Sequence, residues 1–426
     1  MYAGLVLSGN TLYGVADTGG SAGNGTVFAV NTDGSGFTGL HTFTSAPGPF
    51  YTNRDGVLPI GRLVLSGSTL YGTTQGGGAY GHGTVFALNP NGSGFTNLHS
   101  FPAGRFNADG AAPQAGLILS GSTLYGTAYG GGAYGCGTVF ALNTNGSGFT
   151  NLHSFTALTT TAPPFTMNSD GAQPFCDLVL SGNTLYGTAS VGGPSGYGTV
   201  FAVNTDGSGF TVLHNYDDVS DGATPYAGVI LSDNTLYGTA SVGGPSGYGT
   251  VFAVNTNGTG FRIVASSFGG GDAPYGALVL SGNTLYGTTS SGGGDSYYGT
   301  VFAVNIDGSG STSLHGFDVS AGGEPHGALV LSGNTLYGTT PMSEFGSGSV
   351  FSLAYPPPHL AIMLAGTNVV LTWTNIAPVF YLKSTPNLNP PVIWSFVSPL
   401  PVVIGPYNFV TNAIIYSANN FYKLSL

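Results

Sequence analysis

Residues 177–216 read DLVLSGNTLYGTASVGGPSGYGTVFAVNTDGSGFTVLHNY, and this stretch decides the fold. It holds four short runs rich in Val, Leu, Thr, Tyr and Phe, each bounded by Gly, Asn or Asp: 177–181, 184–189, 198–204 and 209–216. Such runs are typical of β-strands. The turns between the first two and the last two runs are tight, and the Asp-Gly of the second favours a hairpin. We predict a four-stranded antiparallel sheet.

The same stretch recurs along the chain, and its phrase LYG marks each copy, at Tyr13, Tyr71, Tyr125, Tyr186, Tyr237, Tyr286 and Tyr337. Repeats of about 50 residues predict a solenoid or a propeller. The first copy begins at its first run and the last copy, ending near residue 353, lacks the fourth. A ring explains both ends, since closure removes open sheet edges. We therefore predict an all-β chain with a seven-bladed β-propeller whose last blade lacks its outer strand.

The missing run has two explanations. In one, the chain is truncated at its N-terminus and has lost both a signal peptide and a strand that would complete the last blade. In the other, the last blade simply has three strands. We expect truncation.

The composition changes after residue 355. We predict a propeller over 1–355, a stiff linker at Pro356–Pro358, and a small β-sandwich of fibronectin or immunoglobulin type over 359–426. The predicted strands of this second domain alternate apolar and polar residues: 360–364, 368–374, 380–383, 393–397, 408–415 and 421–426. Its role could be that of a spacer, a sorting module or a carbohydrate-binding module.

Charge is scarce. The chain has 426 residues, of which 6 are Lys or Arg and 17 are Asp or Glu, and the net charge is −11. Scattered in the sequence, six cations do not make a nucleic-acid surface, because a duplex binder neutralises about 6–10 phosphates. No run approaches the ~18 apolar residues of a membrane span. We expect a monomer that binds neither nucleic acid nor membrane.

The phrases LVLSGNTLYGTT (329–340) and GTVFAVNTDGSGFT (198–211) resemble those of the Gloeo/Verruco tandem-repeat family, and the resemblance covers all seven copies. The repeat is also similar, more weakly, to the kelch repeat, although it lacks the aromatic and arginine pattern of kelch. The resemblance implies an exported, surface or extracellular propeller and implies no particular activity. We accordingly expect the protein to be secreted or at the cell surface.

Loops on one face of the propeller vary between copies. This loop face consists of the loops between the second and third strands and the connections between sheets. Variable loops on a rigid scaffold are the usual place for binding. A ring of tyrosines there predicts a surface for sugars or a protein, since tyrosine joins an apolar body to a polar tip; its members are Tyr80, Tyr134, Tyr197, Tyr248 and Tyr298. The alternative is that these tyrosines only cover the blades.

Acidic residues that break the repeat fall on the same face. Asp17, Asp295 and Glu344 follow the second run in copies one, six and seven, which are consecutive in a ring, and Glu324 lies in the connection between the last two copies. They predict an acidic sector that solvates the face or binds a ligand, with Ca²⁺ as a weaker alternative. Glycosidic cleavage needs two carboxyl groups about 5–9.5 Å apart, and loop spacing does not establish that. We assign no catalytic residue, metal ligand or other cofactor.

Two further sets of residues receive structural interpretations. The histidine of the fourth run recurs once per blade, so its copies are too far apart to share a metal: His41, His99, His153, His214 and His315. Cys136 and Cys176 fall on the loop face of neighbouring blades, and we predict a disulfide between them, consistent with export.

The sequence thus favours an exported binding scaffold for carbohydrate or protein. One alternative is a polysaccharide lyase or hydrolase with its site in the acidic sector. The other is a purely structural array at the cell surface.

Overall fold

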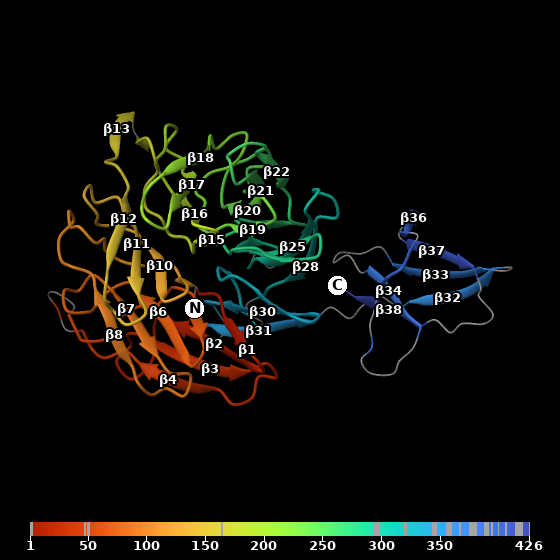
Figure 1. The fold of residues 1–426 in the computed structure, drawn as a ribbon, viewed down its shortest axis with the longest axis horizontal. Coiled ribbons are helices and arrows are strands. Elements are labelled where there is room, and N and C mark those ends of the chain that lie inside the picture. The colour runs from red at the N-terminus through yellow and green to blue at the C-terminus, as the bar shows by residue number, and fades with distance from the viewer. Residues whose placement is uncertain are drawn as a thin grey trace.

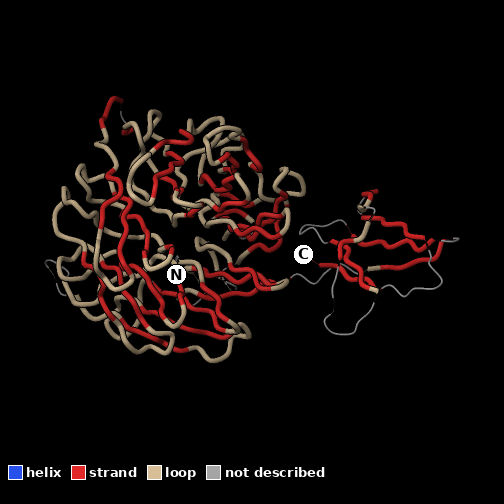
Figure 2. Tube along the Cα trace, in the orientation of Figure 1, coloured by secondary structure: helices blue, strands red, loops and turns tan. Residues whose placement is uncertain are grey.

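The computed structural model describes residues 3–46, 48, 52–162, 165–293, 298–318, 320, 322–342, 347–354, 360–365, 368–374, 381–386, 392, 395–398, 400–404, 407–413 and 421–425. Within these ranges every regular element is a β-strand (Figure 2). No helix in them is long and apolar enough to cross a membrane. The chain is therefore all-β in its described part, as predicted.

The fourth repeat shows how the sequence makes one sheet. Its strands are β15 (Val179–Ser181), β16 (Thr184–Ala189), β17 (Thr199–Asn204) and β18 (Thr211–Asn215), hydrogen-bonded in chain order. All neighbours are antiparallel, with Ser181 opposite Thr184 across the first turn. These bounds lie within two residues of the predicted runs. The Asp206 carboxylate accepts the backbone N–H of Ser208, which closes the turn between β17 and β18.

The other complete repeats form equivalent four-stranded sheets in chain order. Their strands are β1 (Val6–Ser8), β2 (Thr11–Ala16), β3 (Thr26–Asn31) and β4 (Thr38–Thr42); β5 (Val64–Ser66), β6 (Thr69–Thr74), β7 (Thr84–Leu88) and β8 (Thr96–Ser100); β9 (Ile118–Ser120), β10 (Thr123–Ala128), β11 (Thr138–Asn143) and β12 (Thr150–Ser154); β19 (Ile230–Ser232), β20 (Thr235–Ala240), β21 (Thr250–Asn255) and β22 (Arg262–Ala265); β24 (Val279–Ser281), β25 (Thr284–Thr289), β27 (Thr300–Asn305) and β28 (Thr312–Gly316).

The last repeat differs. It forms a three-stranded sheet of β29 (Val330–Ser332), β30 (Thr335–Thr340) and β31 (Ser349–Ala354). Two short ladders lie in connections and loops, and they pair β13 (Thr159–Ala162) with β14 (Phe165–Met167) and β23 (Gly271–Asp272) with β26 (Ser291–Gly292).

The sheets close into a propeller-like ring (Figure 1). In four repeats a threonine hydroxyl of the second strand donates to a backbone carbonyl of the next repeat, as from Thr73 to Ala115 at 2.8 Å and from Thr188 to Ala227 at 2.9 Å. The same bond runs from Thr339 in the last repeat to Ala3 in the first, at 2.9 Å. The contact that joins successive repeats therefore also joins the two ends of the repeat array.

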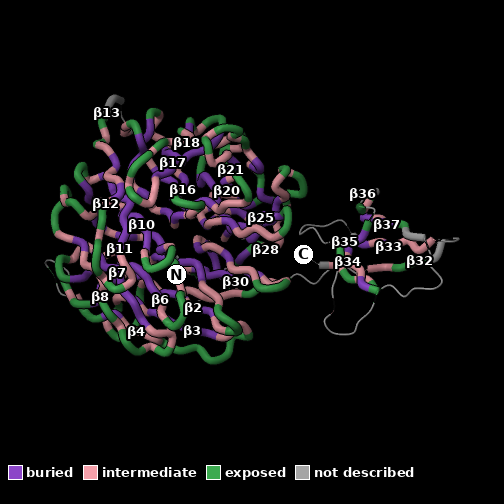
Figure 3. The backbone as a smooth tube through the Cα atoms, in the orientation of Figure 1, coloured by how far each residue is buried: buried purple, intermediate pink, exposed green. Residues whose placement is uncertain are grey.

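The hydrophobic core lies between neighbouring sheets, where Figure 3 shows buried residues concentrated in the strands. One cluster joins Tyr186, Val200 and Tyr216 of the fourth repeat to Leu236 and Phe252 of the fifth. The glycine of LYG makes room for this packing: a Cβ on Gly238 would lie 2.6 Å from Cζ of Phe252. The recurrence of Leu-Tyr-Gly thus has a steric cause.

Four of the five histidines of the fourth strands pair with an aspartate, in agreement with their structural interpretation. Nε2 of His41 lies 3.1 Å from Oδ2 of Asp55, and Nε2 of His214 lies 2.6 Å from Oδ2 of Asp221. Equivalent pairs join His99 to Asp109 and His153 to Asp170. Each pair ties a fourth strand to the connection that follows it.

We predict that the protein loses stability in acid because of two of these histidines, His41 and His99. Burial lowers the pKa of His41 and of His99, and the nearby aspartates offset the shift only in part. As the pH falls below about 6.5, the ordinary histidine pKa, the unfolded chain takes up protons before the folded chain does. We expect the melting temperature to fall between pH 7 and pH 5.

Calorimetry of the wild type and a His41→Asn/His99→Asn double variant measures this effect. The melting temperature of the variant should depend less on pH. The wild type and the variant share their other titrating groups. The difference between their pH dependences therefore reports the contribution of the two histidines. Equal pH dependence in both proteins would contradict the assignment.

The strands beyond the repeats form two further antiparallel sheets, ordered β32-β33-β37-β36 and β35-β34-β38. Their bounds are β32 (Ala361–Ala365), β33 (Asn368–Thr374), β34 (Tyr381–Thr385), β35 (Ser395–Phe396), β36 (Val402–Ile404), β37 (Tyr407–Ala413) and β38 (Phe421–Ser425). Trp373 and Leu382, one from each sheet, share a buried cluster. The sequence did not predict β36. The predicted linker Pro356–Pro358 lies outside the described residues.

Candidate functional site

The connections between sheets bring the chain to the axis of the ring. In each connection a residue with positive φ precedes a proline, and these residues are Leu58, Ala112, Gln173, Thr224, Ala273 and Glu324. The N–H of Thr224 donates to the carbonyl of Tyr197 in the preceding repeat, and its own carbonyl accepts the N–H of Ser241 in the next. The residues just after the proline are thereby held at the mouth of the central channel, on the loop face.

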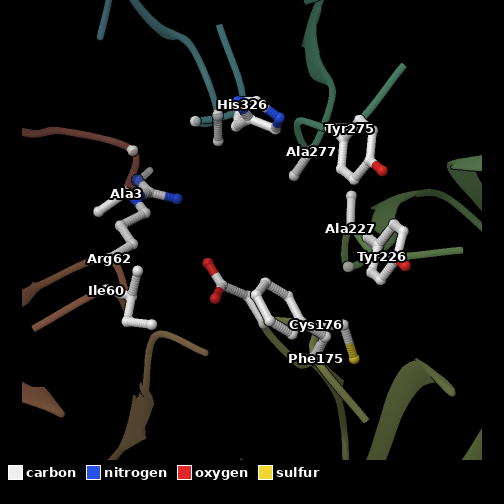
Figure 4. A pocket seen from close by; sticks show the side chains of 15 residues that line it. Ala3, Ile60, Arg62, Phe175, Cys176, Tyr226, Ala227, Tyr275, Ala277 and His326 are labelled. Atoms are coloured by element: carbon white, nitrogen blue, oxygen red, sulfur yellow. The ribbon is translucent and has the colours of Figure 1, made fainter. Parts of the chain in front are cut away.

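A cavity of about 270 Å³ lies at this mouth (Figure 4). Four of the side chains that follow the prolines form an aromatic arc: Phe175, Tyr226, Tyr275 and His326. The rings of Tyr226 and Tyr275 stack with centroids 4.9 Å apart and planes 13° apart. Phe175 meets Tyr226 edge-on at 5.8 Å, and His326 meets Tyr275 edge-on at 4.8 Å. One side of the cavity is therefore a continuous aromatic wall.

Two opposite charges, Arg62 and Asp177, line the same cavity. They stand two residues before the innermost strands of the second and fourth repeats, where other repeats have Gly4, Gly116 or Ala277. Arg62 Nε donates to the carbonyl of Leu5 at 3.2 Å. Asp177 Oδ1 accepts the backbone N–H of Gly116 at 2.6 Å. These charges give the aromatic cavity a polar side.

The burial of Asp177 in the ring changes the pKa of its carboxyl group. Burial raises the pKa of Asp177, and the charge of Arg62 and the N–H of Gly116 lower it in part. Asp177 is half-buried, and Arg62 is exposed. Burial also lowers the pKa of His326. The cavity therefore presents a carboxylate, a guanidinium and an imidazole that favours its neutral form.

A second cavity, of about 730 Å³, continues along the axis. It is lined mainly by aliphatic side chains of the innermost strands, such as Val64, Ile118 and Leu280. Arg62 and Asp177 line both cavities. They therefore mark the boundary between an aromatic mouth and an aliphatic channel.

The predicted ring of tyrosines divides into two groups, and none of its members lines the mouth cavity. Tyr80, Tyr134 and Tyr248 are exposed, with 53%, 48% and 56% of their surface accessible. Tyr197 and Tyr298 are half-buried and pack against hydrophobic clusters. Their carbonyls also accept N–H groups of the connections. Tyr197 and Tyr298 therefore also make structural contacts, and binding by the five tyrosines stays a prediction.

The predicted acidic sector is described only in part. Asp17 and Glu324 are half-buried, and the N–H of Glu324 donates to the carbonyl of Tyr298. Asp295 and Glu344 lie outside the described residues. Among the residues that are described, no group of three or more His, Cys, Asp or Glu side chains could hold a metal ion. Calcium binding in this sector stays a prediction.

The predicted disulfide is wrong: Cys136 and Cys176 are both free and buried. The Cys136 thiol lies 3.5 Å from the carbonyl of Tyr134. The Cys176 sulfur accepts the N–H of Thr188 at 3.1 Å and lies 3.2 Å from its carbonyl. Burial raises the Cys176 pKa to about 11. Each sulfur contacts the backbone of its own repeat, so the two thiols share one hydrophobic cluster without bonding.

Sequence reasoning missed the aromatic arc and the two charges. A usable signal was present. Arg62 and Asp177 break the repeat at a position that otherwise holds Gly or Ala, two residues before the innermost strand. In a closed ring, the position of Arg62 and Asp177 faces the axis, so that the two opposite charges come close to each other.

Repeated sheets, ring closure and an axial cavity define a propeller-like tandem-repeat protein. The chain belongs to the Gloeobacter/Verrucomicrobia repeat family, whose model matches residues 1–167, 49–225 and 158–353. This result confirms the family suggested by the repeated phrases. No curated protein matches the sequence significantly.

Several solved structures are similar at low identity. A putative 6-phosphogluconolactonase from Bacteroides uniformis is 14% identical, with 94% of this chain and 98% of that one covered and a TM-score of 0.48. An oligogalacturonate lyase from Vibrio parahaemolyticus is 11% identical, with 82% and 87% covered and a TM-score of 0.47. A nidogen/laminin complex chain is 13% identical, with 72% and 93% covered and a TM-score of 0.43. At these values we base no functional argument on them.

Proposed function

We propose that the protein is a carbohydrate-binding scaffold whose ligand enters the mouth of the central channel. One observation carries the proposal: the aromatic arc and the Arg62–Asp177 charges line the same 270 Å³ cavity. Small-molecule sites combine apolar and aromatic walls with a few converging polar groups. Their volumes run from about 300 to 1,000 Å³. This cavity fits a small ligand, or the end of a longer chain.

The chemistry of the wall favours a sugar. A sugar ring has apolar C–H faces and a rim of hydroxyl groups. The stacked rings of Tyr226 and Tyr275 offer apolar aromatic carbons along one side of the cavity. Asp177 supplies an acceptor and Arg62 a set of donors for hydroxyl groups. The ligand then contacts aromatic rings on one side and charges on the other.

The enzyme alternative has less support. Paired-carboxylate hydrolysis of a glycosidic bond needs two carboxyl groups about 5–9.5 Å apart. Among the described residues that line the mouth cavity, Asp177 is the one carboxylate. Binding without cleavage is therefore the function that we propose.

We also propose a division of the chain into two domains and a location outside the cell. We infer a seven-bladed propeller over 1–355 and a small β-sandwich over 359–426 that acts as a separate module. The repeated sheets and the two C-terminal sheets support this division. We also propose that the protein is exported, where it would meet polysaccharides. Immunodetection of the native protein in cell and medium fractions tests this location.

A pair of tyrosine variants tests the site. We expect Tyr275→Ala to weaken binding of the best oligosaccharide from a glycan array about tenfold, equivalent to ~1.4 kcal/mol. The matched control is Tyr80→Ala, because Tyr80 is exposed on the loop face and lies outside the cavity. We expect its affinity to stay within about twofold, by calorimetric titration. Loss of affinity in Tyr80→Ala alone would place the site on the loop tyrosines.

A further inference from the structure

A third cavity lies where the last repeat meets the first, away from the central channel. It has a volume of about 510 Å³ and is bounded by β31 on one side and by β3 with its following turn on the other. Its apolar lining includes Phe28, Phe37, Val350 and Phe351. Among the described residues, β31 is the edge strand of its sheet. We call this cavity the strand slot.

The equivalent place in each complete repeat is filled by the fourth strand. In the first four repeats the strand places a histidine on a phenylalanine of the next repeat. Ring centroids are 3.9 Å apart for His41–Phe95, 3.6 Å for His153–Phe210 and 3.5 Å for His214–Phe261, with planes within 8° of parallel. The same strand sets an aromatic ring edge-on against the core, as in Phe43–Phe86 at 5.5 Å.

Between the fifth and sixth repeats both members of the stacked pair are replaced, whereas His315 of the sixth repeat is kept although the seventh repeat has no equivalent phenylalanine. In the fifth repeat, Ala265 replaces the histidine, and in the sixth, Ser311 replaces the phenylalanine that would have faced it. The first repeat keeps this phenylalanine as Phe37. Its presence indicates a histidine partner from a strand that would lie in the slot.

The first repeat already holds the phenylalanine pair on which the histidine of an added strand would stack. Phe28 and Phe37 stack at 5.6 Å with planes 29° apart, much as Phe86 and Phe95 do at 5.5 Å and 24°. Phe37 is nevertheless 68% exposed. On the opposite wall, Val350 and Phe351 are half-buried, whereas the equivalent Val and Phe of the other repeats are at most 1% exposed. The slot thus exposes apolar surface that its counterparts bury.

We propose that the strand slot binds an extended peptide with the pattern Leu-His-x-Phe/Tyr, which pairs antiparallel with β31 and completes the last sheet. Addition of a strand to an open sheet edge gives backbone hydrogen bonds for affinity and side-chain pockets for specificity. The register follows from the other repeats, in which Val200 lies opposite His214 and Val301 opposite His315. Val350 therefore lies opposite the histidine of the peptide, whose ring covers Phe37.

The chain itself supplies a probe. Residues 211–221, TVLHNYDDVSD, contain a fourth strand, its histidine and aromatic residue, and the aspartate that pairs with the histidine at 2.6 Å. We expect a fluorescent peptide of this sequence to bind the full chain saturably, by fluorescence polarisation. A peptide with the His→Ala and Tyr→Ser changes should bind at least tenfold more weakly. Hydrogen exchange should slow at backbone amides of 349–354.

Two protein variants make the test specific. We expect Phe37→Ala to weaken peptide binding about five- to tenfold, the effect of one aromatic contact. Phe106→Ala is the matched control, because Phe106 is 69% exposed and does not line the slot. Both positions are exposed, so both variants should fold. Equal binding by wild type and Phe37→Ala would overturn the proposal. Absence of peptide binding would overturn the proposal too. This includes the case in which the protein sediments as a dimer because a second copy of the chain fills the slot.

Discussion

Replacing Phe252 by alanine is expected to lower the free energy of unfolding by about 3–5 kcal/mol, the range for loss of a buried phenylalanine. Phe252 is fully buried between the fourth and fifth repeats. Its ring stacks on Phe261 at 5.7 Å and meets Tyr216 edge-on at 5.7 Å. Gly238 closes the space behind it, so the cavity would not be filled by a neighbouring side chain. Urea unfolding followed by tyrosine fluorescence measures the change.

The control for this prediction is the same chemical change at an exposed site. Phe106 is 69% exposed, and the guanidinium carbon of Arg105 lies 5.5 Å from its ring centroid. Phe106→Ala should change the unfolding free energy by less than about 0.5 kcal/mol. Similar losses in the two variants would mean that the core does not lie between the sheets.

Gly228→Ala is expected to have the second-largest effect on stability, a loss of about 3 kcal/mol. A Cβ at this position would overlap the backbone carbonyl oxygen of Asp177. Because the obstacle is backbone, two neighbouring sheets must move apart, at the upper end of the cost of overpacking. Gly228 and Asp177 also line the mouth cavity. The variant should therefore lose oligosaccharide affinity as well as stability.

Gly39→Ala provides the comparison, because a Cβ on Gly39 meets nothing within 4 Å. It adds the same methyl group to an exposed strand and should change stability by less than about 0.5 kcal/mol. Both variants can be measured by thermal and urea unfolding. If Gly228→Ala unfolded like Gly39→Ala, the close approach of the sheets at the axis would be wrong.

The strands were predictable because the same local pattern is written in every copy. β16 begins and ends where the sequence places it, at Thr184 and Ala189. Glycine and asparagine turns bound the runs, so local chemistry was sufficient. The C-terminal strands were less regular, and β36, Val402–Ile404, lies in a Pro- and Val-rich stretch without a clear alternation.

The sequence predicted that the candidate site lies on the loop face, but it did not predict which residues form it. Variable loops drew attention to exposed tyrosines such as Tyr80, whereas the aromatic arc comes from the residues after each proline. Those residues, including Tyr226 and Tyr275, converge only when the ring closes. The cysteines failed for the related reason that a shared face does not bring two sulfur atoms into bonding geometry.

We expect a sugar ligand to sit on the axis of the ring, against Tyr226 and Tyr275 and beside Asp177. The most direct measurement is a crystal structure of the protein soaked with the oligosaccharide that binds best on a glycan array. We predict ligand density stacked on the aromatic arc within the 270 Å³ cavity. Density over the exposed loop tyrosines Tyr80, Tyr134 and Tyr248, with an empty channel mouth, would contradict it.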